Sequence, residues 1–551
     1  MLKKISFLTF GLLTGFGILS LSFGTRPNDF EVKKNLEIFA AIFRELNALY
    51  ADQIDVKKLT ETAIDAMLNS LDPYTTYIDE ENMEVYRIQT TGKYGGIGAL
   101  IRTSGDWVLI AEPYDGSPAQ RNGIMAGDKL LQIDGKSAKN KNTDDVSKML
   151  KGQPGTEVRI LLERVGESKP IEKIIKREEI KINPVPYFGM VNSKTGYIRL
   201  NSFTEDCGSV IANALSELKS KNGAQSLILD LRDNPGGLLD EAIKTANIFI
   251  PKGQEVVSTK GKERGADRSY KAPDEPSDNG IPLVVLIDSG SASASEIVSG
   301  VIQDLDRGIV IGERSYGKGL VQSTKTLSYN GKLKVTTAKY YLPSGRCIQA
   351  IDYSEGANRE DHKKMADSLH TPFKTKGGRT VYDTGGIKPD HEIEKPYLAN
   401  VTVALANKQY AFDYATVYRS KHPSINTPDK FELSDAEYDE FVRFLTGKDY
   451  EYVTESEHYL KELKKKAEKE QYADALKAEI ADLENQLKSD KSKDLYKFKN
   501  EIKTMLEIEI VSRYYYQRGQ VQESLEDDPD IKKSIEILNN PASYKQALEK
   551  K

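Results

Sequence analysis

The residues best suited to covalent chemistry lie in one serine cluster and one lysine loop. The stretch from Asp288 to Glu296 reads DSGSASASE, and it follows an apolar run at 282–287 that predicts a buried strand. Apolar residues at helical spacing come next, so the cluster is expected where a strand turns into a helix. The amides at a helix start stabilise negative charge, so a serine there could attack a carbonyl carbon. A serine-rich turn that only caps the helix is the alternative.

The chain offers a lysine, and no nearby histidine, as a base for that serine. The first of its five histidines is His362, more than 60 residues beyond the cluster, whereas Lys318 lies between two glycines in GERSYGKGLVQ. Glycines permit close backbone approach, so this lysine need not be a solvated surface residue. To act as a base near pH 7, its pKa must fall by roughly three from about 10.4, chiefly through burial, at about 4 kcal/mol. We therefore expect a dry, preorganised site.

The SASASE cluster, the YGKG loop and the glutamine that follows resemble the C-terminal processing peptidases, also called tail-specific proteases. In that family the nucleophile is the middle serine of the cluster and the lysine lies 25 residues further on. Ser293 and Lys318 match this spacing, and Gln322 matches the family's glutamine four residues after the lysine. The resemblance extends from about residue 30 to 395. It implies a PDZ-containing serine endopeptidase with Ser-Lys catalysis.

The same resemblance implies an oxyanion hole. The loop at 233–237, DNPGG, follows an apolar strand and matches the family's DLRxNxGG motif. The amide of Gly236 or Gly237 would then join the amide of Ala294 to bind the developing negative charge. An ordinary turn before a helix is the alternative for Pro-Gly-Gly. Arg232 is expected to hold the loop and not to react.

Residues 91–180 are expected to form a PDZ β-domain. Short alternating apolar runs predict strands at 99–102, 107–111, 129–133 and 158–164. The glycine-rich start opens onto a strand-like segment, which disfavours a dinucleotide loop. Resemblance to PDZ domains implies that the amides around Gly96, Ile97, Gly98 and Ala99 bind a terminal carboxylate while the peptide adds to the sheet edge. A small β-domain with a glycine-rich turn is the alternative.

The two ends of the chain differ in composition from the middle. Lysines at positions 3 and 4 precede an apolar run, so 1–24 is predicted to be a signal peptide or a retained membrane anchor of a periplasmic or otherwise exported protein. Residues 29–90 are predicted to be helical and to pack on the core. Residues 397–551 are predicted to be a charged helical region packed on the core, with a dimerisation or partner-binding role as the alternative.

Strands and helices alternate over 181–396, which predicts an α/β sheet with chemistry at the strand ends. The family resemblance implies that this protease core is crotonase- or ClpP-like. The predicted fold class is therefore α/β and multidomain: an N-terminal helical segment, a PDZ β-domain, the α/β protease core and a C-terminal helical region.

Composition narrows the partners and cofactors. The net charge of −5, from 78 basic and 83 acidic residues, disfavours a general nucleic-acid binder. Cys207 and Cys347 fit no metal or redox spacing, and we expect two separate small residues unless they pair after export. The sequence has no HExxH or other metal-ligand cluster, so no metal or cofactor is expected.

The predicted function is a serine endopeptidase of the exported compartment. It would recognise unfolded or flexible C-terminal tails of exported proteins through the PDZ domain and cut peptide bonds with the Ser-Lys dyad. One alternative is a non-catalytic PDZ scaffold or chaperone, which leaves the serine cluster and the lysine loop unexplained. Another is a nucleotide binder, because 312–318 has GxxxxGK spacing. Gly319 stands where that motif needs Ser or Thr, and no helix pattern follows directly.

Overall fold

The computed structural model describes residues 29–263, 265–353, 371–394, 397–491 and 493–549. The predicted export segment, 1–24, lies outside the described residues. The chain forms two compact units, 1–70 and 71–551, and each is described by itself. Within the described ranges, no helix has both the length and the apolar character that a membrane span requires.

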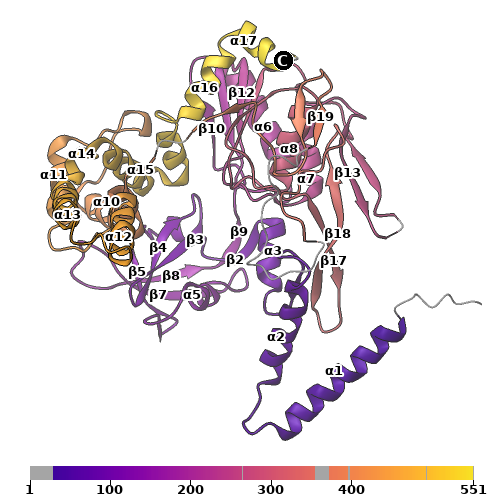
Figure 1. Cartoon of the computed structure of the whole chain (residues 1–551), viewed down its shortest axis with the longest axis horizontal. Helices are drawn as coiled ribbons and strands as arrows, with labels where there is room; N and C mark the ends of the chain where they lie inside the picture. The colour runs from indigo at the N-terminus through magenta and orange to yellow at the C-terminus, as the bar shows by residue number, and fades with distance from the viewer. Residues whose placement is uncertain (1–28, 264, 354–370, 395–396, 492, 550–551) are drawn as a thin grey trace, which may run out of the picture. The chain divides into compact units, whose positions relative to one another are not determined.

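The described part of the first unit consists of two helices, α1 (Asp29–Leu49) and α2 (Val56–Asn69), drawn in indigo in Figure 1. Helix α2 begins at Asp55, whose carboxylate accepts a hydrogen bond of 3.0 Å from the amide of Lys58. Helix α1 buries none of its residues, and Phe39 on it is 52% exposed. An apolar helix face is therefore open to solvent within this unit.

The predicted PDZ region is a small antiparallel domain. Its main sheet has the order β3-β4-β5-β7-β8, with β6 paired to β5, while β2 pairs with β9. The elements are α3 (Met83–Thr91), β2 (Lys93–Gly96), β3 (Ala99–Ser104), β4 (Trp107–Pro113), α4 (Pro118–Arg121), β5 (Lys129–Ile133), β6 (Lys136–Ser137), α5 (Thr143–Leu150), β7 (Glu157–Glu163), β8 (Ile171–Lys176) and β9 (Glu178–Lys181). Strands lie where the alternating runs predicted them.

The central sheet has the order β10-β11-β12-β15-β16-β21 and is parallel except for its first pair. The elements are β10 (Tyr187–Met190), β11 (Thr195–Arg199), α6 (Cys207–Asn222), β12 (Ser226–Asp230), α7 (Leu239–Asn247), β15 (Leu283–Ile287), α8 (Ala294–Asp304), β16 (Ile309–Gly312) and β21 (His391–Glu392). The alternation of strands and helices confirms an α/β core. Cys207 is buried and Cys347 is partly exposed, and both are free thiols, so they do not pair.

The two faces of this sheet are covered by different parts of the chain. In β15, Leu283, Val285 and Ile287 pack in a core with helices α6, α7 and α8. The intervening residues Val284 and Leu286 pack instead with apolar side chains of the last two helices, α16 (Pro529–Leu538) and α17 (Pro541–Leu548). Figure 1 shows these last helices, in yellow, beside the sheet. Successive residues of a strand point to opposite faces, so the end of the chain completes the protease core.

The core contains a second sheet. Its path is β1-β18-β13-β14, and β17 also pairs with β18. The elements are β1 (Thr76–Ile78), β13 (Glu255–Gly261), β14 (Arg268–Lys271), β17 (Leu320–Thr326) and β18 (Lys332–Tyr341), with a separate hairpin of β19 (Pro372–Lys374) and β20 (Thr380–Tyr382). Strand β1 belongs to this sheet, so the segment at 72–78 is part of the second compact unit.

The other C-terminal helices are α9 (Asn400–Asn407), α10 (Tyr410–Lys421), η2 (Pro428–Lys430), α11 (Asp435–Phe444), α12 (Glu455–Lys469), α13 (Lys477–Lys491), α14 (Asp494–Lys497) and α15 (Lys499–Ser524). Apolar side chains of α9, α10, α11, α14 and α15 form a core of their own. Helix α15 contains a kink at Tyr516, whose φ is 55°. The helical prediction for this region is confirmed. Helices α16 and α17 are in addition an integral part of the protease core, since they cover one face of the central sheet.

Candidate active site

The serine cluster lies at the turn between β15 and α8, as its pattern predicted. Ser291 and Ser295 are fully buried, and their hydroxyls donate to the carbonyls of Leu231 and Asn234, both at 2.8 Å. Ser293, immediately before α8, is only partly buried and has φ 55° and ψ −109°. Such backbone strain in a non-glycine residue is found at functional sites, where the surrounding structure maintains it. Of the three serines in the SASASE segment, Ser293 is therefore the candidate for chemistry.

A buried glutamate joins the serine turn to the lysine loop. Oε2 of Glu296 accepts hydrogen bonds from the backbone amides of Ser293, at 2.7 Å, and Lys318, at 2.9 Å. Its Oε1 accepts the amide of Gly317 and the hydroxyl of Ser315. Burial raises the pKa of this carboxyl against the lowering effect of its hydrogen bonds. Three of its partners are amides that can only donate, and this hydrogen-bonding pattern favours the ionised carboxylate.

The side chain of Lys318 is largely removed from water. Burial first, and the like charge of Lys334 second, lower the pKa of Lys318 to about 8, against the opposing effects of Glu296 and Asp72. The ammonium nitrogen lies 4.4 Å from the centroid of the Tyr74 ring. A lowered pKa is what a lysine base near neutral pH would require. The loop from 313 to 319 leads into strand β17, and no helix follows, which disfavours the phosphate-loop alternative.

The glycine loop after β12 packs directly on the serine turn. A Cβ added to Gly236 would lie 2.7 Å from the carbonyl oxygen of Ala292 and 2.9 Å from the amide of Ala294. The amide of Gly236 donates to the side chain of Asn234 at 2.9 Å. Within the described ranges, the amides of Gly237 and Ala294 have no acceptor. Two unpaired amides next to a serine are what an oxyanion hole requires.

Gln322 lies on β17 and reaches toward the N-terminal part of the second unit. Its amide nitrogen donates to the hydroxyl of Thr336 at 3.2 Å, and the Thr336 amide donates to the hydroxyl of Thr75 at 3.2 Å. Thr75 and Tyr74 are fixed in turn by Asp72, whose Oδ1 accepts both of their amides at 2.8 Å. The segment 72–76 (DPYTT) thus places the Tyr74 ring over Lys318, and Thr336 connects Gln322 to the same segment.

The amides predicted to bind a terminal carboxylate, at 96–99, form what we call the carboxylate nest. This nest borders an apolar groove of the PDZ region. The groove has a volume of about 200 Å³ and is lined by residues that include Ile97, Ala99, Leu100 and Leu150. Gly98 has φ 76°, and its carbonyl accepts the amide of Tyr114. Ile97 itself is 2% exposed and belongs to the domain core. The groove lies between β3 and α5, where a peptide strand could add to the sheet edge.

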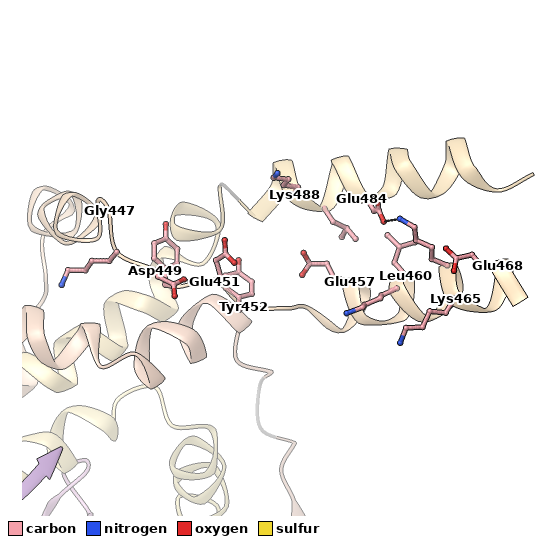
Figure 2. Close-up of a pocket in the computed structure, with 15 residues that line it drawn as sticks. Gly447, Asp449, Glu451, Tyr452, Glu457, Leu460, Lys465, Glu468, Glu484 and Lys488 are labelled. Atoms are coloured by element: carbon pink, nitrogen blue, oxygen red, sulfur yellow. Dashed lines mark hydrogen bonds and ion pairs between the residues drawn. The ribbon is translucent and has the colours of Figure 1, made fainter. Parts of the chain in front are cut away.

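Another cavity lies in the C-terminal helical region. It measures about 1380 Å³, and residues of α12 and α13 face it across the opening in Figure 2, where Lys464 and Glu484 form an ion pair of 3.0 Å. The labelled side chains mix both signs of charge, with Glu457, Glu468 and Lys488 among them. This cavity has no serine or cysteine in its lining, so it does not provide the chemistry of the serine turn.

Three contributors to the site carried no predicted role. Glu296 stood at the end of the serine cluster, and its Ser-x-x-Glu spacing from Ser293 is a capping-box signal that could have found it. Asn234 and Tyr74 act through contacts with residues distant in sequence, which no local pattern reveals. Within the described residues, no group of three or more His, Cys, Asp or Glu is arranged to hold a metal ion.

Comparison with known proteins gives four family matches along the chain. Residues 23–82 match the N-terminal domain of the activating protease CtpB, 109–164 a PDZ domain, 194–355 peptidase family S41, and 401–538 the C-terminal helical domain of a probable PDZ-protease. The chain is therefore multidomain, with an N-terminal helical region, a PDZ domain, an S41 protease core and a C-terminal helical domain. The predicted fold class is confirmed.

The chain is also similar to individual proteins. The carboxy-terminal-processing protease of Bartonella bacilliformis is 38% identical over 355 residues, which cover 64% of this chain and 81% of the relative. A probable CtpA-like serine protease of Staphylococcus aureus is 38% identical over 319 residues, covering 57% of this chain and 63% of that protein. The solved structure of a photosystem II D1 C-terminal processing protease shares 27% identity, with a TM-score of 0.34, over 65% of this chain and 92% of that one.

A PDZ-containing peptidase core of this kind defines a class of serine-type endopeptidases. The chain belongs to that class as a member of the carboxy-terminal-processing protease family, peptidase family S41.

Proposed function

We propose that this protease captures free C-terminal tails in its PDZ groove and cuts peptide bonds with Ser293 as nucleophile and Lys318 as base. The observation that carries the proposal is the Glu296 carboxylate, one oxygen of which holds the backbone amides of both residues, at 2.7 and 2.9 Å. A shared anchor of this kind fixes the separation of the two chain segments, which a nucleophile and its base require.

The reaction begins with Lys318 in its neutral form. The lysine nitrogen accepts the proton of the Ser293 hydroxyl as the serine oxygen attacks the carbonyl carbon of the scissile bond. The carbonyl oxygen becomes negative and is bound by the amides of Gly237 and Ala294, because the Gly236 amide is engaged by Asn234. The C–N bond then breaks, and the lysine ammonium gives its proton to the departing amine.

Hydrolysis of the acyl-enzyme completes the cycle. Neutral Lys318 takes a proton from a water molecule, whose oxygen attacks the ester carbon, and the ammonium returns a proton to the serine oxygen as the ester bond breaks. Gln322 positions the lysine side of the site, since an amide can orient a neighbour but does not transfer the proton. No metal or cofactor takes part in this scheme.

Tail capture rests on the groove beside Gly96, Ile97, Gly98 and Ala99. Strand addition needs an unpaired peptide backbone, so the substrates would be proteins with flexible or unfolded C-terminal tails that end in an apolar residue. The exposed side chain of Leu100 provides part of an apolar wall for that residue. Amidation of a substrate tail would remove the carboxylate that the nest binds and slow its cleavage.

The location of the protein is part of the proposal. Residues 1–24 have the basic and apolar pattern of an export signal or anchor, so we place the protease in the periplasm or another exported compartment. We also propose that two copies associate through the apolar face of α1, where Phe39, Ile42 and Leu36 are about half exposed or more. Fractionation of cells and measurement of the mass in solution test these two statements.

The test of the proposed function compares free-acid and amidated forms of one peptide. The intact protein should cleave the free acid faster, and the Ser293→Ala variant should cleave neither while binding the free acid normally. Cleavage by Ser293→Ala at the wild-type rate would exclude the serine, and equal rates for the two peptides would exclude tail recognition.

A further inference from the structure

An ion cluster connects the start of helix α16 to the root of the glycine loop. Nη1 of Arg232 lies 2.7 Å from the carboxylate of Asp528 and 2.8 Å from the carboxylate of Asp530. On its other side, Arg232 binds Asp230, with Nη2 at 2.6 Å from Oδ2 and Nε at 3.0 Å from Oδ1. The two C-terminal carboxylates come from a position about 300 residues further along the chain.

All four charged groups of this cluster are withdrawn from water. The side chain of Asp230 is fully buried and that of Arg232 is 11% exposed. Burial opposes the charge on Asp230, but Arg232 and Arg199 outweigh it and lower the pKa of Asp230 to about 2. Hydrogen-bonded charges in such a setting hold their partners more firmly than surface ion pairs do. The cluster therefore fixes the Arg232 side chain between strand β12 and helix α16.

The backbone connects Arg232 directly to the glycine loop that packs on the serine turn. It immediately precedes the loop 233–237, and the next residue, Asp233, donates its amide to Asp288 at the start of the serine turn, at 2.9 Å. The preceding residue, Leu231, accepts the hydroxyl of Ser291 at 2.8 Å. A shift of the backbone at 232 would thus be transmitted to the glycine loop and to the serine turn together.

Asp528 and Asp530 allow the positively charged Arg232 to lie against the start of helix α16. Asp528 caps the helix, since its Oδ1 accepts the amide of Asp530 at 2.8 Å, and its other oxygen contacts Arg232. A helix start carries partial positive charge, so the guanidinium would be repelled there without the intervening carboxylates. Glu523 and Glu526 line the cavity beside the same contact.

We infer that the C-terminal helical domain is a positioning element of the catalytic site. In this role, Asp528 and Asp530 hold Arg232 and thereby fix the position of the glycine loop 233–237, whose Gly237 amide belongs to the proposed oxyanion hole. The inference rests on the proposed role of Ser293 and of the loop amides. It assigns the acids no contact with the substrate. Their loss should weaken transition-state binding while leaving the capture of tails in the PDZ groove unchanged.

The test uses the full-length chain with the double substitution Asp528→Asn and Asp530→Asn. Asparagine keeps a cap acceptor at 528 and removes both charges, and Asp230 still neutralises Arg232, so the variant is expected to fold. The matched control is Asp527→Asn, since the Asp527 side chain is 80% exposed and pairs with Lys532 instead. Melting temperature and the Kd of a free-acid tail peptide report on folding and on the PDZ groove.

The double variant should lose about tenfold to a hundredfold in kcat with KM changed less than about twofold. Its Kd for a peptide aldehyde, which forms a tetrahedral adduct with a serine, should rise by a similar factor. Asp530→Glu in the Asp528→Asn background should restore part of both losses. The control should behave as the wild type.

Wild-type kcat in the double variant would overturn the inference, and so would parallel losses in kcat, tail-peptide Kd and melting temperature, which indicate general destabilisation. Failure of the proposed function is recognised separately, because Ser293→Ala measured alongside would then retain cleavage.

Discussion

In the proposed mechanism, the protonation state of Lys318 determines whether Ser293 can be activated. With a pKa of about 8, roughly one lysine in ten is neutral at pH 7 and roughly nine in ten at pH 9. Only the neutral form accepts a proton, so kcat/KM should rise about tenfold between pH 6 and 7 and level off above pH 8. Initial rates on one tail peptide in buffers of constant ionic strength measure this. A rate that falls steadily from pH 6 to 9 in the folded protein would contradict a neutral lysine base.

Substitutions at the two residues separate their roles. Ser293→Ala and Lys318→Ala should each lower kcat by about 10⁴-fold or more while the protein stays folded. Lys318→Arg should not recover activity, because a guanidinium keeps its proton. Circular dichroism and tail-peptide binding serve as controls for folding. Turnover within tenfold of the wild type in either alanine variant would remove that residue from the mechanism.

Glu296 is expected to be as important as the residues it holds. In Glu296→Gln, one of the two side-chain positions becomes an NH₂ group, which must face a backbone amide donor of Ser293, Lys318 or Gly317. The unpaired donors cost about 1–3 kcal/mol and displace the serine and the lysine, so kcat should fall at least about 100-fold. Glu217→Gln, on the exposed face of α6, is the matched control. Equal activity of the two variants would show that the glutamate bridge has no role.

At the scale of elements, periodicity found the parts of the chain whose side chains pack locally. The apolar runs before the serine cluster and before the lysine loop became β15 and β16, and the alternating runs at 99–164 became strands of the PDZ domain. Successive residues of a strand point to opposite faces of the sheet, so burial of one face or of both faces produces an apolar pattern that can be read from the sequence.

Other elements could not be predicted because their partners are remote. Helices α16 and α17 look like any amphipathic helix, and only the fold reveals that they cover the central sheet beside Val284 and Leu286. The closeness of the Tyr74 ring to Lys318 likewise depends on strand β1 pairing with β18. The serine and lysine were predicted because family motifs mark them, whereas their buried bridge depends on side-chain geometry.

The glycine loop makes a prediction at this scale. Gly236→Ala should lower kcat by about 100-fold, because the new Cβ would crowd the carbonyl of Ala292 and the amide of Ala294, and φ is +100°. Gly253→Ala is the control, since φ there is +79° and no atom lies within 4 Å of the added Cβ. That control should cost about 1 kcal/mol of stability and leave kcat unchanged. Similar kcat values for both variants would indicate that close packing on the serine turn is unimportant.

For the whole molecule, we expect the contact between the PDZ domain and the C-terminal helical domain to depend on pH. Burial raises the pKa of Glu112, on β4, to about 7, although Arg513 and the backbone at 517 on α15 act against it, while Glu509 adds to the rise. Arg102 of β3 also lies over the Phe412 ring of α10, at 4.4 Å. A raised pKa means that stability is fully present below the unfolded value near 4.5 and is lost as pH rises through about 7.

Removal of the buried charge of Glu112 should therefore stabilise the folded protein at high pH only. Glu112→Gln should raise the melting temperature by about 2–4 °C at pH 8 and by almost nothing at pH 5, where the wild-type carboxyl is already protonated. Glu172→Gln, at an exposed site on β8, should show neither effect. Differential scanning fluorimetry at both pH values measures the difference. An equal shift at pH 5 and pH 8 would mean that the carboxyl does not titrate in this window.

The most direct test of the central claim is to trap the acyl-enzyme and locate it. The intact protein is mixed with an activated ester of a tail peptide, quenched in acid at millisecond intervals and mapped by mass spectrometry, at several pH values from 6 to 9. The account predicts acylation of Ser293 alone, at a rate that rises with pH to a midpoint near 8 and is lost in Lys318→Ala. Acylation of another residue, or of Ser293 at a rate that neither pH nor Lys318→Ala alters, would contradict it.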